Sequence, residues 1–155
     1  MRNLEVRPLL IRPATSVDIP AIKTLEQHSA TAAHWKPEQY EHLFRTSSQR
    51  TVLVIEDSSN QRVEGFLVAR DSGGEWEIEN IVVSHQRHGL GTHLLSEFLN
   101  HARRRGAAAI FLEVRESNLA ARALYQKLRF EKNGRRKSYY RDPEEDAILY
   151  RLQFT

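Results

Sequence analysis

Hydrophobic residues recur along this chain in segments that alternate between strand spacing and helix spacing. Short apolar runs rich in β-branched residues predict strands over residues 9–12, 51–56, 63–70, 76–83, 108–114, 130–133 and 147–154. Apolar residues three and four positions apart predict helices from a cap at 15–18 to about 28, then over 37–44, 92–105 and 119–128. No linker, repeat or low-complexity segment interrupts this order, so we expect a single α/β domain over residues 1–155.

The central strand–helix–strand segment predicts where a ligand binds. Its helix of fourteen residues, 92–105, spans roughly 21 Å at 1.5 Å per residue. That length lets it run back along the first strand, so that the second strand starts parallel to it. The C-terminal ends of the two strands, Val83 and Val114, then lie at one edge of the sheet, where open α/β sheets bind ligands. Glu113 is therefore expected beside the turn that leaves the first strand.

That turn, within Asn80–Gly91, has the features of a phosphate cradle. It leads into a helix N-terminus, where backbone N–H groups lack partners and the helix dipole is positive. Gly89 and Gly91 allow unusual dihedrals and a close approach of the backbone to a ligand. Two common glycine motifs do not fit. A dinucleotide fingerprint needs a glycine where Leu94 stands, and a P-loop needs Gly-Lys-Ser/Thr where Gly91-Thr92-His93 stands.

Composition excludes several function classes. The chain has 40% hydrophobic and 28% charged residues and no apolar run of membrane-spanning length. Arginines interrupt the apolar stretch within residues 1–13, so a signal peptide is not expected. A cytoplasmic location is expected instead. There are no cysteines, which excludes disulfides, thiolate ligands and a cysteinyl acyl-enzyme. Without a Gly-x-Ser-x-Gly elbow either, any acyl transfer is expected to be direct.

The charge pattern permits an acidic partner without identifying one. The net charge is +3 and the pI is about 9.4. Two basic runs stand out: 103–105 at the end of a helix, where cations complement the dipole, and 135–137, expected in a charged loop. Neither is interleaved with aromatic residues, so stable nucleic-acid binding is not expected. His85, His88 and His93 surround a turn without a carboxylate companion, and no metal site is expected.

The helix over 119–128 carries two further candidate residues. Ser117 or Asn118 is its expected cap, and Ala121, Tyr125 and Leu128 share one face. Asn118 and Tyr125 can then both face the cleft between the two parallel strands. The alternative for each is structural: Asn118 only caps the helix, and Tyr125 only packs against the sheet.

The order and spacing of these blocks resemble a known family. Gln86-x-x-Gly89-x-Gly91 is similar to the pyrophosphate-binding turn of the GNAT superfamily of acyl-CoA-dependent N-acetyltransferases. Further blocks resemble the RimI-type ribosomal-protein alanine N-acetyltransferases. They are residues 80–83, 112–118 and 123–125, supported by Tyr139-Tyr140 and 145–148. The resemblance implies a mixed, mostly antiparallel sheet with a central parallel strand pair splayed for acyl-CoA and helices on both faces.

The resemblance also implies a co-substrate, an acceptor and residue roles. The co-substrate is acetyl-CoA, and the acceptor is a protein N-terminal α-amine, that of an alanine in a small-subunit ribosomal protein. Cofactor contacts are implied for Ile81, Val82, Val83, Arg87, His88, Gly89, Leu90, Gly91, Thr92 and Asn118. Glu113 is implied as the general base and Tyr125 as the acid for the departing thiolate. The enzyme is expected to be a monomer or weak dimer.

The chemistry requires these residue types. An α-amino group has a pKa of about 7.7–8.0, so it must lose a proton before it attacks a thioester, and a carboxylate can accept that proton. A backbone N–H at Val83 could stabilise the oxyanion, and a tyrosine O–H can protonate the sulfur. Glu79 is a competing base because it shares the strand parity of Val83, unless a bulge changes that parity.

Two departures from the family pattern concern the acceptor side and the last helix. Residues 33–37 match the family's aromatic substrate loop only loosely, and Arg129 stands where glycine is common before Phe130. If position 129 is left-handed, arginine is strained there. Two other functions stay open: acetylation of a small-molecule amine or polyamine on the same fold, and a noncatalytic acyl-CoA-binding module.

Overall fold

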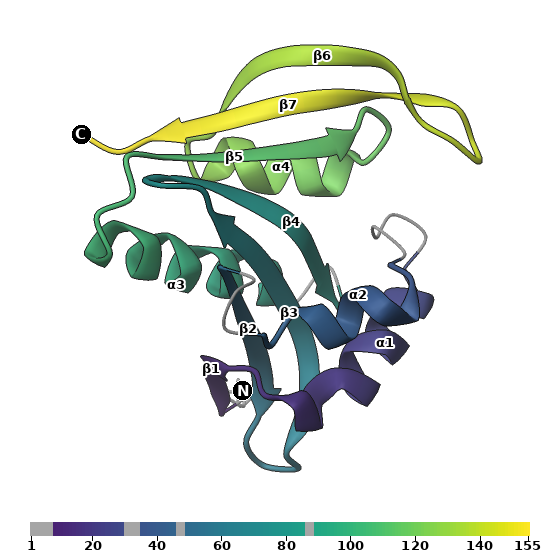
Figure 1. The fold of residues 1–155 in the computed structure, drawn as a ribbon, viewed down its shortest axis with the longest axis vertical. Helices are drawn as coiled ribbons and strands as arrows, with labels where there is room; N and C mark the ends of the chain where they lie inside the picture. Colours follow the sequence, from purple (N-terminus) through teal and green to yellow (C-terminus); the bar gives the residue numbers. More distant parts are fainter. Residues whose placement is uncertain (1–7, 30–34, 46–48, 86–88) are drawn as a thin grey trace, which may run out of the picture.

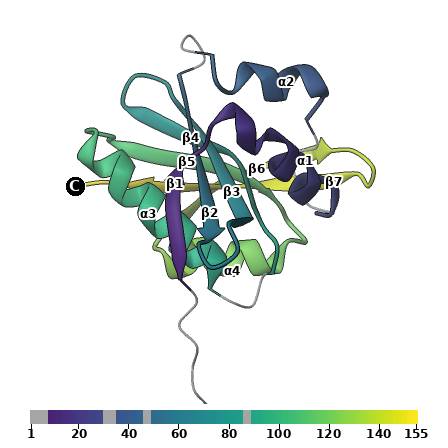
Figure 2. The same ribbon diagram turned by 90° about the horizontal axis from the view of Figure 1, so that it is seen from below.

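The protein forms one seven-stranded sheet with helices on both faces (Figures 1 and 2). The structure is a computed structural model that describes residues 8–29, 35–45, 49–85 and 89–155. The strands are β1 (Leu9–Pro13), β2 (Arg50–Asp57), β3 (Arg62–Asp71), β4 (Glu75–Val83), β5 (Ala109–Arg115), β6 (Glu131–Tyr140) and β7 (Glu145–Gln153). The helices are α1 (Ile19–Gln27), α2 (Pro37–His42), α3 (Leu90–Arg104) and α4 (Leu119–Lys127), with a 3-10 turn, Ser16–Asp18, before α1.

The sheet separates two apolar clusters. One face is covered by α3 and α4, whose buried residues include Leu94, Phe98 and Tyr125. The other face is covered by α1 and α2 through Ile22 and Tyr40. Figure 2 shows the helix pairs on opposite sides of the strands. The amphipathic periodicity that predicted the helices therefore corresponds to real burial against the sheet.

The strand order is β1-β2-β3-β4-β5-β7-β6, and every neighbouring pair is antiparallel except β4 with β5. This confirms the mixed, mostly antiparallel sheet with one central parallel pair. The β4–β5 ladder runs only from Glu75 with Ala109 to Ile78 with Leu112. Beyond that point the two strands diverge toward their C-terminal ends, as Figure 1 shows. The central pair is therefore splayed, as expected.

A bulge in β4 changes the side-chain parity of its second half. Val68 of β3 pairs with Asn80 and the adjacent Ala69 with Ile78, so Glu79 is an extra residue on β4. Before the bulge Ile78 packs in the α3–α4 cluster, whereas Val82 packs in the α1–α2 cluster. The assumption of unbroken alternation from Glu79 to Val83 is therefore wrong.

The last hairpin differs most from expectation. Strand β6 extends to Tyr140, so the basic run 135–137 lies in a strand and not in a charged loop. Nearly every residue of β6 is exposed, because this strand is the outer edge of the sheet and has no apolar face to bury. The run 103–105 does lie, exposed, at the end of α3, as predicted.

Candidate active site

A cavity of about 890 Å³ lies where β4 and β5 diverge. Its walls come from β4, β5, α4, the N-terminus of α3 and the β6–β7 hairpin, and Trp35 reaches it from the start of α2. Nine of the residues predicted for the site line it: Ile81, Val82, Val83, Gly89, Gly91, Thr92, Glu113, Asn118 and Tyr125. Leu90 is buried beneath the cavity, so only its backbone could contribute. Arg87 and His88 lie outside the described residues.

The N-terminus of α3 opens onto the cavity. Gly89 is its N-cap in the left-handed conformation, with φ +70°, and its carbonyl accepts a bond from the His93 N–H at 3.0 Å. The first-turn N–H groups precede that bond and have no intrahelical partner. Gly91 matters for a different reason, since a Cβ there would lie 3.2 Å from Leu124 Cδ2 of α4, a contact that this side chain would have to relieve by moving slightly. The turn thus presents unpaired amides at a positive helix end.

In the gap between the diverging ends of β4 and β5, alternate residues of each strand face opposite sides of the sheet. After the bulge, Ile81 and Val83 pack toward the α3–α4 cluster, while Asn80 lies opposite Val68 on the α1–α2 side. On β5 the alternate residues 110, 112 and 114 pack in the α3–α4 cluster. Glu113 therefore faces the α1–α2 side.

Glu113 is held by two side chains of β6. Arg136 Nε lies 3.0 Å from Glu113 Oε1. Hydrogen bonding to the same carboxylate is the main cause that raises the pKa of Tyr139 above its ordinary value. The pKa of Glu77 on β4 is also raised, first by burial and then by the negative charges of Glu113 and Glu79. The α1–α2 side of the gap is therefore rich in carboxylates, as a site for a cationic amine requires.

Tyr125 reaches the gap from the opposite side, on α4. Its ring is 4% exposed and packs 5.8 Å from Phe130 and 5.9 Å from Tyr150, measured between ring centroids. Burial raises its pKa above the ordinary value, so the phenol is a proton donor at neutral pH. Asn118 Oδ1 accepts from the Ala121 N–H at 3.2 Å. The capping and packing roles are thus both present, and both residues also line the cavity.

Glu79 lines the cavity too, but it is engaged elsewhere. Arg50 at the start of β2 donates to both of its carboxylate oxygens, at 2.6 and 3.2 Å. This bidentate pair joins residues 29 positions apart, which is why the sequence pattern did not suggest it. A carboxylate held by two bonds from one guanidinium is less free to turn toward an incoming amine than one held by a single ion pair, as Glu113 is by Arg136.

The structure adds site residues that sequence reasoning had not selected. Arg136 was assigned to a loop, and Tyr139 was noted only as a family match. Asn80 is 7% exposed and lines the cavity, and its Nδ2 has no hydrogen-bond partner within the described part of the chain. The available signal for Asn80 was a polar residue directly before the apolar run 81–83 at the end of a buried strand.

Within residues 8–29, 35–45, 49–85 and 89–155, no group of three or more histidine or acidic side chains is arranged to hold a metal ion. None of the helices in those ranges is long and apolar enough to cross a membrane.

Comparison with known proteins gives a consistent result. A model of the acetyltransferase (GNAT) family matches residues 19–130. The ribosomal protein bS18-alanine N-acetyltransferase of Escherichia coli K12 is 35% identical over 141 residues, which are 88% of this chain and 92% of that protein.

Solved structures agree with this match. The crystal structure of the ribosomal-protein-S18-alanine N-acetyltransferase from Escherichia coli has a TM-score of 0.84 at 30% identity and covers 95% of this chain and 94% of that one. The structure of yncA from Salmonella typhimurium, with its cofactor acetyl-CoA, has a TM-score of 0.77 at 25% identity and covers 95% and 94%.

Proposed function

This chain belongs to the acetyltransferase (GNAT) family, and from that premise we propose that it acetylates the N-terminal α-amine of a protein, with the alanine of ribosomal protein bS18 as first candidate. It is an N-acetyltransferase that uses acetyl-CoA. The acceptor is carried over from its relatives, of which the Escherichia coli enzyme is 35% identical. The cytoplasmic location expected from the sequence is part of this proposal, since ribosomal proteins are made there.

The α3–α4 side of the gap suits the acyl donor. The unpaired amides after Gly89 fit a pyrophosphate, and the free edge of β4 beyond Ile78 fits an extended arm with amide groups of its own. Asn118, at the N-terminus of α4, lines the same cavity. In this arrangement the thioester lies at Val83, whose N–H is the proposed oxyanion donor.

The α1–α2 side suits the amine. Glu113 accepts a proton from the α-ammonium group, directly or through water, and the neutral amine attacks the thioester carbonyl carbon. The nitrogen of the tetrahedral intermediate loses its second proton to water, the C–S bond breaks, and the thiolate takes a proton from the Tyr125 hydroxyl, which water then reprotonates. Base and acid approach from opposite faces of the sheet, so the amine enters and the thiol leaves on different sides.

The observation that carries this proposal is the shared cavity. Glu113, Tyr125 and the N-terminus of α3 all line one space, which opens because the β4–β5 ladder ends at Ile78. For the choice of base, both carboxylates pair with an arginine, but Arg50 holds both oxygens of Glu79 whereas Arg136 pairs with one oxygen of Glu113, which favours Glu113.

Mass spectrometry tests the function. The protein is incubated with acetyl-CoA and an alanine-initial peptide that also contains lysine, and the same peptide with a blocked α-amine is the control. One acetyl group confined to the α-amine supports the proposal. Acetylation only of lysine side chains or only of free amines would show that the acceptor belongs to another class of amine. Tight acetyl-CoA binding without any transfer would support a noncatalytic acyl-CoA-binding module.

Matched variants test the residue roles. We expect Glu113→Gln to lower kcat by roughly 100-fold or more and Glu79→Gln to have the smaller effect, while acetyl-CoA binding measured by calorimetry is retained in both. The reverse order assigns the base to Glu79. Tyr125→Phe should likewise lower kcat more than it weakens acetyl-CoA binding.

A polyamine acceptor is the second candidate. It is favoured by the three carboxylates Glu77, Glu79 and Glu113 around one cavity, since such a cluster suits a ligand with several ammonium groups. A panel of spermidine and related amines, run beside the peptides, compares the two by kcat/KM.

A further inference from the structure

Strand β6 contains a bulge of several residues near the acceptor side of the gap. Arg136 pairs with Ala147 of β7, and the next pair is Tyr140 with Glu145. Residues 137–139 of β6 therefore face the single residue Asp146. Within the bulge Ser138 has φ +51°, a left-handed conformation that residues other than glycine adopt only when something holds them there.

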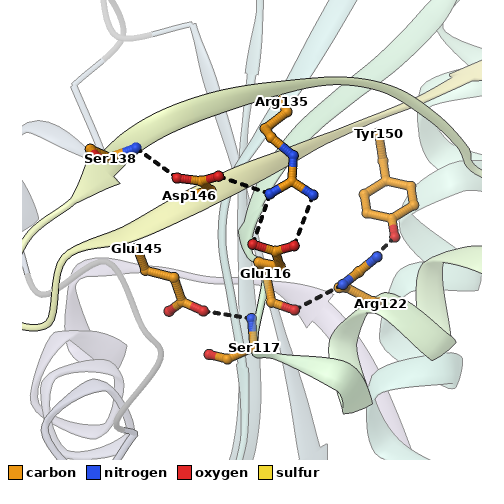
Figure 3. Close-up of polar contacts among 8 residues, drawn as sticks. All are labelled: Glu116, Ser117, Arg122, Arg135, Ser138, Glu145, Asp146 and Tyr150. Atoms are coloured by element: carbon orange, nitrogen blue, oxygen red, sulfur yellow. Dashed lines mark hydrogen bonds and ion pairs between the residues drawn. The ribbon is translucent and has the colours of Figure 1, made fainter.

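Asp146 supplies that hold. Its Oδ1 accepts from the Ser138 N–H at 2.8 Å, and its Oδ2 accepts from Arg135 Nη1 at 2.8 Å. Arg135 also donates to both carboxylate oxygens of Glu116, each at 2.8 Å. Figure 3 shows the Arg135 guanidinium bonded to Asp146 on one side and to Glu116 on another, so that it links the β6–β7 hairpin with the β5–α4 turn. We call Arg135, Glu116 and Asp146 the hairpin clamp.

The clamp is also joined to α4. The carbonyl of Glu116 accepts from Arg122 Nη1 at 2.9 Å, and Arg122 Nε donates to the Tyr150 hydroxyl at 3.1 Å. Tyr150 in turn packs against the Tyr125 ring. These contacts fix the β6–β7 hairpin relative to α4, the helix that carries the proposed acid Tyr125. Figure 3 shows the bonds as far as Tyr150.

The bulge determines where β6 places its side chains. Tyr139 packs edge-on against Tyr140 at 5.1 Å, and the guanidinium of Arg136 lies 5.5 Å from the centre of the Tyr139 ring. Arg136 forms an ion pair with Glu113, and the same carboxylate raises the pKa of Tyr139. Bulges commonly redirect side chains beside active sites in this way.

We propose that the hairpin clamp positions the acceptor side of the active site, holding the β6 bulge so that Tyr139 and Arg136 stay against Glu113. None of the three clamp residues lines the cavity, so they act through other residues. Their side chains are 25–43% exposed, and ion pairs this exposed add little to global stability. The inference rests on the proposed function, because it takes Glu113 as the base.

Kinetics of clamp variants test the positioning role. Asp146→Ala removes both bonds of the carboxylate, whereas Asp146→Asn keeps an acceptor for the Ser138 N–H. We expect kcat/KM for the peptide to fall roughly tenfold to 100-fold in Asp146→Ala and less in Asp146→Asn. Acetyl-CoA binding and Tm should stay near wild type. The control is Arg62→Gln, which removes an exposed guanidinium that pairs with the buried Glu64 carboxylate on β3, a strand that β4, β5 and β7 separate from β6.

A double-mutant cycle separates positioning from general damage. Tyr139→Phe and Asp146→Ala should be strongly non-additive, because the second already displaces Tyr139. Additive effects, or equal losses in Arg62→Gln, would overturn the proposal.

A spectroscopic readout distinguishes failure of the clamp from failure of the function. The Tyr139 phenol is titrated by NMR with ring-labelled tyrosine. Its pKa is raised by the hydrogen bond and charge of Glu113, by burial and by Glu77, against the charge of Arg136. In Asp146→Ala we expect the pKa to move down toward 10.0, the ordinary value. An unchanged Tyr139 titration refutes the clamp even if the enzyme is active, and a shifted one supports it even if no peptide is acetylated.

Discussion

Replacing Arg129 by glycine should stabilise this protein. Helix α4 ends in a Schellman motif: the Phe130 N–H bonds to the Tyr125 carbonyl and the Arg129 N–H to the Gln126 carbonyl, each at 3.0 Å. The rings of Phe130 and Tyr125 supply the apolar contact that accompanies this motif. Position 129 has φ +72°, so the strain expected for arginine at this position is present.

The size of the effect follows from two opposing costs. A side chain with a Cβ pays roughly 1–2 kcal/mol in the left-handed conformation. Glycine avoids that cost but loses about 0.5–1 kcal/mol more backbone entropy on folding. The net gain in the free energy of unfolding is therefore about 0.5–1 kcal/mol, or a Tm increase of about 1–4 °C for a chain of this length.

The assay is thermal and urea unfolding, followed by circular dichroism at constant pH. Arg129→Ala is the matched control, because it removes the exposed guanidinium and keeps the Cβ. We expect Arg129→Gly to be more stable than both the wild type and Arg129→Ala. If alanine stabilises as much as glycine does, the charge and not the dihedral angle was the cost, and the reasoning fails.

Three further predictions concern the cavity. Asn80→Leu should raise the unfolding free energy of the free protein by about 1 kcal/mol, because it removes a buried amide nitrogen, Nδ2, that has no hydrogen-bond partner among the described residues, and a loss in urea unfolding would contradict this. Glu77 has a raised pKa, chiefly from burial, so the folded state holds its proton more tightly and the ionised group opposes folding. Glu77→Gln should therefore raise Tm at pH 7, and the gain should vanish below the ordinary value of 4.5; a gain independent of pH would refute it. Gly89→Ala, at φ +70°, should cost about 1–2 kcal/mol of stability and weaken acetyl-CoA binding in calorimetry more than Gly91→Ala does.

Much of the donor side could be predicted from the sequence because its signals are local. The β-branched run before Val83, the glycines at 89 and 91 and the helical spacing after them lie within some twenty residues. Short-range periodicity and the geometry of a crossover were enough to bring Val83, Val114 and Glu113 to one edge. All three residues line one cavity at that edge, which confirms this part of the prediction.

The acceptor side could not be predicted in the same way because its contacts are distant in sequence. Glu113 meets Arg136 across the sheet, and Glu79 meets Arg50 from another strand. Strand β6 has almost no buried residues, so no alternation of apolar residues indicated that it continues beyond Asn133. A bulge such as that at Glu79 leaves no mark in the pattern of residue types and appears only when the pairing is known.

The extra residue at Glu79 also bears on how such an enzyme could change its target. The bulge turns Asn80 and Val82 to the α1–α2 layer and Ile81 and Val83 to the α3–α4 layer. Mutations that change recognition of the amine therefore need not disturb the residues that hold the acyl donor. Divergence of specificity would then proceed in one layer while the other stays constant, and a grafted β6–β7 hairpin offers a direct route to retargeting.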